Sequence, residues 1–405
     1  MNEASPGHKG DPKVVVTHAL RTPIGRFLGS FADLTAVDLG VSVVTDLLGR
    51  AGVAPEEVGE LVFGNGRQAG GGPNPARQIS VRAGLSHGAP AYTVNMACAS
   101  GLKSIALASE SILLGRTDIA VAGGTESMSG LPFLLPGMRR GYRLGHAPLV
   151  DAMYKDGFEC PLADMLMGGT AEKLAREFDI PREEQDRFAV ESQQKAGAAE
   201  TEGRFDSQLS PVTVKSRKGE AVVERDEHMR PQTTLESLAK LPPVFDPKNG
   251  TVHAGNSSGI TDGAAALLLM TEEKAEALGL APLARLGDHT QVGLDPTIMG
   301  LGPVPACEAL QKKNDLKVGD YDLIELNEAF AAQVLACGRK LPFLGDRLNV
   351  NGGSIALGHP IGATGARIVV TLLHELARRG GRNGLATLCI SGGLGMAMAF
   401  HRVEA

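Results

Sequence analysis

Two parts of the chain that lie far apart in sequence repeat one another. Residues 53–65 read VAPEEVGELVFGN, and residues 316–327 read LKVGDYDLIELN. A second pair matches in the same order, with TVNMA at residues 93–97 and NVNGG at residues 349–353. Internal repetition constrains architecture more strongly than any local signal. The sequence therefore predicts a duplicated α/β unit whose two copies pack side by side and bring their strand-to-helix turns to a shared crevice.

Within each copy, short apolar runs alternate with stretches of helical periodicity. The expected strands are at 14–16, 61–63, 91–94, 119–122, 323–326, 348–351, 385–389 and 396–400. The expected helices are at 38–50, 75–83, 101–114, 303–312, 329–340 and 365–379. Such alternation is typical of a sheet covered by helices. It indicates the α/β class.

The stretch between the two copies has a different texture. It contains prolines, the basic cluster Arg139, Arg140 and Arg143, an amphipathic helix at 182–202 and charged stretches such as 224–227. We expect it to form a mostly surface-exposed insertion. Residues 261–270 return to buried-strand composition and should rejoin the first sheet. The predicted domains are therefore residues 1–130 with 261–281, an inserted loop domain at 131–260, and residues 282–405.

Composition excludes several classes of protein. The 405 residues carry a net charge of −6, which gives no general nucleic-acid footprint. No apolar run approaches the ~18 residues needed to span a bilayer, and residues 1–13 are expected to form a short polar tail. The five cysteines are odd in number and widely spaced, without zinc-ligand spacing. We therefore expect neither a disulfide framework nor a metal site, and a reducing, cytoplasmic location.

One cysteine occupies a chemically favourable place. Cys98 lies where the strand at 91–94 runs into the helix at 101–114. Unpaired N–H groups at a helix start stabilise an anion and lower the pKa of a thiol, so this position suits a nucleophile. An ordinary small core residue is the alternative interpretation.

Three loops of the second copy should reach the same crevice as Cys98. They read NEAF at 327–330, NGGSIALGHPIGATG at 351–365 and CISGGLG at 389–395. Each could be explained separately, because glycines make turns and a single histidine is often structural. Their joint occurrence at corresponding turns of a duplicated fold favours a functional site.

These motifs resemble the signatures of the thiolase family. NMACASG at 95–101, NEAF at 327–330, GHP at 358–360 and CISGG at 389–393 occur in the family's order, and the resemblance extends from residue 14 to residue 403. It implies two pseudo-symmetric mixed-sheet βαβαβαββ halves in a layered αβαβα core, with an inserted loop domain.

The resemblance also implies catalytic roles. Cys98 would be the acylated nucleophile, His359 its proton acceptor and Cys389 the acid and base of the condensation. Asn327 would orient a water in one oxyanion hole, and the backbone N–H groups of Cys98 and Ser391 would form a second. Many thiolases have glycine at the position of Ser391. A positive φ there would cost a serine about 1 kcal/mol or more.

Further positions match the family's substrate contacts. Arg230 matches an arginine near the nucleotide of CoA, and Ser258 matches a serine on the pantetheine arm. Met167, Met299 and Phe330 match the walls of the acyl pocket, although methionine is commonly plain core packing. The basic cluster lies where some members have a tetramer-forming loop, and a solvated charge cluster is the alternative.

The resemblance implies an acetyl-CoA C-acetyltransferase, with CoA and acetyl-CoA as substrates and no tightly bound cofactor. The alternatives are a broader 3-ketoacyl-CoA thiolase of fatty-acid β-oxidation and an inactive thiolase-like protein that binds acyl-CoA. A ketoacyl-carrier-protein synthase shares the duplicated fold, but it lacks the second cysteine. We expect acyl-CoA partners, no nucleic acid, no membrane span, and a homodimer or homotetramer.

Overall fold

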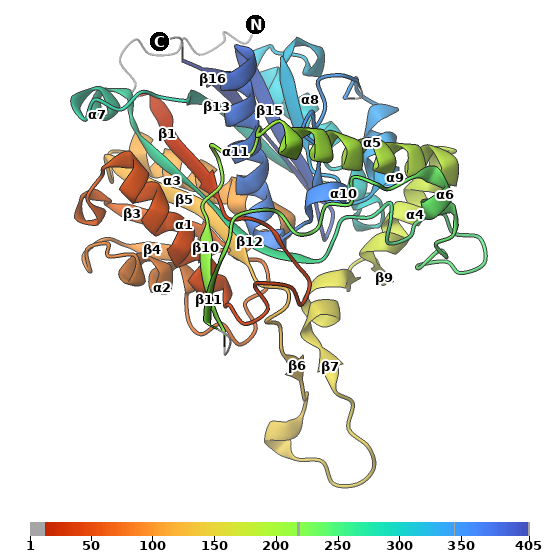
Figure 1. Cartoon of the computed structure of the whole chain (residues 1–405). Helices are drawn as coiled ribbons and strands as arrows, with labels where there is room; N and C mark the ends of the chain where they lie inside the picture. The colour runs from red at the N-terminus through yellow and green to blue at the C-terminus, as the bar shows by residue number, and fades with distance from the viewer. Residues whose placement is uncertain (1–12, 217–218, 344, 404–405) are drawn as a thin grey trace, which may run out of the picture.

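The computed structural model describes residues 13–216, 219–343 and 345–403 (Figure 1). The predicted N-terminal tail lies almost wholly outside these residues. A ten-stranded sheet dominates the fold, with the strand order β14-β15-β16-β13-β1-β12-β5-β3-β4 and β2 paired to β12. Its two halves join at the antiparallel pair β1 and β13, through Val15 with Arg285 and Val16 with Ala284.

The two halves of the sheet repeat one pairing pattern. In the first half, β3 is parallel to β4 and β5, while β12 is antiparallel to β5 and β1. In the second half, β14 is parallel to β15, while β16 is antiparallel to β15 and β13. The strands are β1 (Val14–Arg21), β2 (Gly25–Arg26), β3 (Glu60–Gly64), β4 (Ala91–Val94), β5 (Ile119–Glu126), β12 (Thr261–Thr271), β13 (Ala284–Gly293), β14 (Leu323–Leu326), β15 (Asn383–Ile390) and β16 (Leu394–Arg402). The repetition confirms the predicted duplicated α/β fold.

One expected strand is largely absent. At 348–351 the structure has a single parallel bridge between Leu348 and Ile324. Asn349 adopts a positive φ of 43°, which a continuing strand does not allow. Its side chain instead accepts a hydrogen bond from the N–H of Leu326 and donates one to the carbonyl of Leu326. An asparagine side chain thus replaces the backbone ladder at this edge.

The helices form three layers, one between the two halves of the sheet and one on the outer face of each half. Residues of α3 and α11 share one apolar core with β12 and β15, so these helices lie between the two halves. Helices α1 and α2 cover the outer face of the first half, and α8 covers that of the second. The bounds are α1 (Ala36–Ala51), α2 (Pro75–Arg82), α3 (Ser100–Leu113), α7 (Glu272–Ala277), α8 (Pro303–Asn314), α9 (Ala331–Gly338), α10 (Ser354–Leu357) and α11 (Ile361–Arg379).

The two central helices touch at glycines. A β-carbon on Gly101 would lie 2.6 Å from the backbone nitrogen of Ala366, and one on Gly365 would lie 2.4 Å from that of Leu102. Only glycine permits this approach. Because Cys98 precedes α3 and His359 precedes α11, the contact brings the starts of both helices together.

The insertion contains short hairpins and longer helices. An arm that carries β6 and β7 extends away from the body (Figure 1) and bears Arg139, Arg140 and Arg143. The elements are β6 (Phe133–Leu134), β7 (Val150–Asp151), β8 (Glu159–Cys160), β9 (Met165–Leu166), α4 (Met167–Glu177), α5 (Arg182–Thr201), β10 (Val212–Ser216), β11 (Gly219–Val223) and α6 (Leu235–Ala239). Helix α5 confirms the predicted helix at 182–202.

The side chain of Asp226 is buried within the insertion. Its carboxylate pairs with the guanidinium of Arg21 through two hydrogen bonds of 2.7 and 2.8 Å, and the side chains are 1% and 0% exposed. Asp226 also accepts a hydrogen bond from the N–H of Ile24. The pair attaches the insertion to the end of β1.

We predict that Asp226→Asn lowers the free energy of unfolding by about 3–5 kcal/mol, because it leaves the Arg21 cation buried without its counter-charge. Denaturant titration measures the change. The control is Glu220→Gln, which breaks the exposed 3.0 Å pair of Glu220 with Lys215 and should cost less than about 1 kcal/mol. Equal losses in the two variants would contradict a special role for the buried pair.

Candidate active site

The turn that carries Cys98 is tightly held. Strand β4 ends at Val94, and a 3-10 helix (Ala97–Ala99) leads directly into α3. Ala97 has a positive φ of 45°, a conformation that costs a non-glycine residue about 1–3 kcal/mol. The Asn95 side chain accepts from the Ala97 N–H at 3.0 Å, and the Ser100 hydroxyl accepts from the Met96 N–H and donates to the Ala97 carbonyl. Strain held by side-chain hydrogen bonds is typical of functional turns.

His359 contacts the thiol of Cys98. Its Nε2 lies 3.4 Å from the Cys98 Sγ. On the other side of the ring, Nδ1 lies 2.6 Å from the Thr364 hydroxyl, which itself donates to the Pro360 carbonyl. Nδ1 must therefore carry the proton, and Nε2 is free to accept one from the thiol. Burial, Arg367 and Arg67 lower the pKa of His359 to about 3, so the imidazole is neutral at physiological pH.

Asn327 completes this group. Its Nδ2 lies 3.5 Å from the Nε2 of His359, and its Oδ1 accepts from the Ser354 hydroxyl at 2.6 Å. Ser354 in turn accepts a 2.7 Å hydrogen bond from the buried guanidinium of Arg367. These contacts orient the amide so that its donor points toward the imidazole. Ser354 and Arg367 were not identified from sequence, because each acts only through a neighbour that the fold supplies.

The environment of the Cys98 thiol differs from the expected one. Burial raises the pKa of this thiol, whereas the helix start was expected to lower it. Arg67 and the backbone N–H groups of Ser391 and Cys98 oppose the rise, in that order. The two N–H groups predicted to form an oxyanion hole thus lie at the sulfur. Ser391 is not among the residues with positive φ, so serine is accommodated there without the backbone strain considered above.

Cys389 is fully buried at the end of β15. It packs with Met299 and Ala329, and Met167 and Phe330 lie against this cluster. Burial raises the pKa of Cys389 well above its ordinary value, and the neighbouring charge of Cys98 adds to the rise. Cys98, His359, Asn327 and Cys389 thus converge, with Met167, Met299 and Phe330 around the second thiol.

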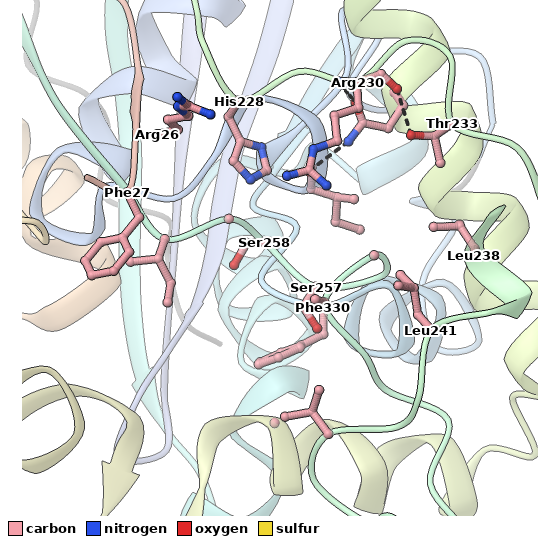
Figure 2. A pocket seen from close by; sticks show the side chains of 18 of the residues that line it. Arg26, Phe27, His228, Arg230, Thr233, Leu238, Leu241, Ser257, Ser258 and Phe330 are labelled. Atoms are coloured by element: carbon pink, nitrogen blue, oxygen red, sulfur yellow. Dashed lines mark hydrogen bonds between the residues drawn. The ribbon is translucent and has the colours of Figure 1, made fainter. Parts of the chain in front are cut away.

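A cavity of about 900 Å³ adjoins this site. Four of the residues expected to contact substrate line it: Met167, Arg230, Ser258 and Phe330. Met299 belongs to the cluster around Cys389, and Phe330 packs against that cluster. Figure 2 shows Arg230 and His228 on one side of the cavity and Ser258 and Phe330 across from them.

The cavity also has walls that sequence did not identify. Arg26, Phe27, Tyr154, Phe158 and His228 line it. They come from β2 and from the insertion, and no spacing in the sequence relates them. Only His228 had a local signal, since it stands two residues before Arg230.

Residues 13–216, 219–343 and 345–403 contain no group of three or more His, Cys, Asp or Glu side chains that could hold a metal ion. Across the same residues, every helix is too short or too polar to cross a membrane.

The chain belongs to the thiolase family. The family model "Thiolase, N-terminal domain" matches residues 14–273, and "Thiolase, C-terminal domain" matches residues 280–402. Among curated relatives, the acetyl-CoA acetyltransferase of Cupriavidus necator is 49% identical over 96% of this chain and 99% of its own length. That of Pseudomonas aeruginosa is 50% identical over 96% of this chain and 99% of its own.

Solved structures agree with this assignment. The Bacillus anthracis acetyl-CoA acetyltransferase superimposes with a TM-score of 0.95 at 44% identity, covering 98% of this chain and 100% of that one. Human mitochondrial 3-ketoacyl-CoA thiolase in complex with CoA superimposes with a TM-score of 0.93 at 41% identity, covering 97% and 98%. The thiolase fold predicted from the four motifs is confirmed.

We predict that His359 makes the protein sensitive to acid. Its folded-state pKa lies below its unfolded value near 6.5, so the stability present above that value is lost as pH falls toward 3. Between pH 7.5 and 5, the free energy of unfolding of the parent should fall by about 2 kcal/mol more than that of His359→Gln. Urea titrations at the two pH values measure this difference. An equal fall in the free energy of unfolding in both proteins would mean that the imidazole of His359 is not held neutral.

Proposed function

We propose that the chain is an acetyl-CoA C-acetyltransferase, which condenses two acetyl-CoA reversibly to acetoacetyl-CoA and CoA through an acyl-cysteine. The observation that carries this proposal is the contact of the Cys98 Sγ with the Nε2 of a neutral His359, within reach of a second buried thiol at Cys389. Relatives about 50% identical over nearly the whole chain bear that activity in their names.

Acyl transfer to Cys98 comes first. His359 Nε2 accepts the thiol proton, and the Cys98 thiolate attacks the thioester carbonyl of acetyl-CoA. The N–H groups of Cys98 and Ser391 stabilise the negative charge on the tetrahedral intermediate. CoA leaves with the proton of the Cys389 thiol, which becomes a thiolate, while His359 keeps the Cys98 proton and the acetyl group remains on the Cys98 sulfur.

Condensation follows on the acylated enzyme. The thiolate of Cys389 removes a proton from the methyl group of a second acetyl-CoA, and the enolate is stabilised at His359 and at a water oriented by Asn327. The new carbon–carbon bond forms as the Cys98–carbonyl bond breaks, and the Cys98 sulfur takes back its proton from His359. In thiolysis the same atoms run in reverse, and the raised pKa of Cys389 keeps its thiol protonated and ready to donate.

CoA would occupy the adjoining cavity. Arg230 would bind near the nucleotide, and Ser258 would contact the pantetheine arm. Met167, Met299 and Phe330 would enclose the acyl group next to Cys389. CoA acts as substrate, and the proposal includes no tightly bound cofactor.

The second candidate function is a broader 3-ketoacyl-CoA thiolase of fatty-acid β-oxidation. Its specific support is the apolar part of the cavity, where Phe27, Tyr154, Phe158 and Leu166 could accept a longer chain. An inactive acyl-CoA-binding protein is disfavoured, because all four catalytic side chains are present and grouped.

Assembly and location are also proposals. The arm at 131–151 exposes Phe133, Leu144 and Leu149, with Leu144 98% exposed. Together with its arginines, this supports a homodimer or homotetramer with oligomer contacts on the arm. We also propose that the domains divide at 130/131, 260/261 and 281/282. The proposed location is cytoplasmic.

We predict that Cys389→Ala still forms acetyl-Cys98 from acetyl-CoA but loses condensation by about 10²–10⁴-fold, because only the proton transfer is removed. Mass spectrometry of the Cys98 peptide and acetoacetyl-CoA formation measure the two steps. Cys307→Ala, which removes a buried thiol of α8, should retain both steps. An unlabelled Cys98 in the parent would favour the binding-protein alternative.

A chain-length series separates the two enzymatic alternatives. In thiolysis we expect kcat/KM to be at least about tenfold higher for acetoacetyl-CoA than for 3-ketohexadecanoyl-CoA, because Met167 and Met299 narrow the space beside Cys389. Met299→Ala should reduce this preference. If the parent prefers the long chain, the broad thiolase is the better assignment.

A further inference from the structure

Arg67 is a buried cation beside the active site. It follows β3 and is 7% exposed. Its two terminal nitrogens donate to backbone carbonyls, those of Gly66 at 3.0 Å and Gly157 at 3.3 Å, rather than to a carboxylate. Its Nε is buried and has no hydrogen-bond partner among the described residues. The carboxylate of Glu126 interacts with this charge electrostatically, but its hydrogen bond is to the backbone N–H of Arg67 and not to the guanidinium. Burying a cation without a direct ion pair is costly, so the arrangement calls for a function.

One of these contacts braces the turn of the nucleophile. The Gly66 carbonyl that accepts from Arg67 also accepts from the Asn95 amide at 3.2 Å. Asn95 in turn holds the N–H of Ala97, the strained residue directly before Cys98. Three hydrogen bonds therefore connect Arg67 to the strained position.

The other contact fixes a wall of the cavity. Gly157 belongs to a π-helix (Tyr154–Phe158), and a β-carbon at Gly157 would lie 2.7 Å from the Arg67 Nε. Phe158 packs in the same apolar cluster as Cys98, and Tyr154 meets it edge to face at 5.5 Å. Both aromatic rings line the cavity. Isolated π-helical turns frequently occur at functional sites.

Arg67 is also the strongest favourable charge for the thiolate. The titratable groups around Cys98 are Arg67 after β3, Glu126 at the end of β5, His359 before α11 and Cys389 on β15. Arg67 lowers the pKa of Cys98 more than Glu126 raises it. It also helps to keep His359 neutral by lowering the pKa of that imidazole.

We propose that Arg67 is a positioning residue of the acyl-transfer step, whose buried guanidinium stabilises the Cys98 thiolate and clamps the π-helix against the nucleophile turn. The inference rests on the proposed function, since it concerns the same nucleophile. It assigns the activation of the thiol to a charge from the loop after β3, in addition to the neighbouring imidazole.

Thiol alkylation tests the proposal without substrate. Iodoacetamide labelling of the Cys98 peptide is followed by mass spectrometry from pH 6 to 10 in the parent, Arg67→Met and Arg67→Lys. Methionine has about the length of arginine but no charge. In Arg67→Met the pH midpoint of Cys98 labelling should therefore rise by about one pH unit, and labelling at pH values below that midpoint should be about tenfold slower than in the parent. Lysine keeps the charge, so the labelling rate of Cys98 in Arg67→Lys should stay within about threefold of the parental rate. Lysine cannot donate to the carbonyls of Gly66 and Gly157 together, so the KM for acyl-CoA should rise.

Arg347→Met is the matched control. Arg347 also donates to backbone carbonyls, those of Gly319 and Tyr321, but it lies outside the site, so its loss should leave the labelling profile of Cys98 unchanged. A folded Arg67→Met protein with the parental profile would overturn the proposal. If Arg67→Met does not fold, a full-unit rise in Arg67→Lys, which keeps the charge, would overturn it as well. Failure of the proposed function is separately visible, because Cys98→Ala would then retain thiolysis.

Discussion

The site depends on the glycine contact between α3 and α11. Each helix belongs to a different half of the duplicated fold, and each follows a loop that carries one reactive side chain. Gly101 and Gly365 let the backbones approach to a distance that any β-carbon would prevent. Sulfur and imidazole can then meet without any long or flexible side chain spanning the interface. A duplicated fold thus provides two helix starts of similar geometry, and close packing turns them into one site.

A buried carboxylate holds the same junction from the other side. Glu126, at the end of β5, accepts hydrogen bonds from the N–H groups of Gly66 and Arg67 and from that of Gly362 at the start of α11. Burial raises the pKa of Glu126 to about 7, while Arg67 and the three N–H groups oppose the rise. One side chain therefore links β5, the loop of Arg67 and the helix after His359. These hydrogen bonds add directional contacts to the apolar cluster in which Met128, Ile361 and Cys98 pack.

Sequence could predict the parts of this arrangement that are local. Cys98 stood out because a strand-to-helix turn surrounds it, and the second-half loops stood out because they recur at corresponding turns. The pKa of Cys98 could not be predicted, because residues that are distant in sequence, such as Phe158 and Ile361, contribute to its burial. The loss of the expected strand at 348–351 has a similar reason, since the side-chain amide of Asn349 reaches the backbone of Leu326 only in the folded chain. Arg67 was missed because its charge matters only through the turn and the π-helix that the fold brings to it.

The two thiols show how environment divides one chemistry into two roles. Cys98 is partly exposed, and it has Arg67, His359 and two N–H groups beside it, all of which favour or accept the charge of acyl transfer. Cys389 has methionine and aromatic neighbours and a raised pKa, so it holds its proton until a carbanion needs it. Identical side chains can thus act as nucleophile and as acid because their surroundings separate their pKa values. Two thiolates so close together would repel each other, so the charge of one thiol keeps the other protonated.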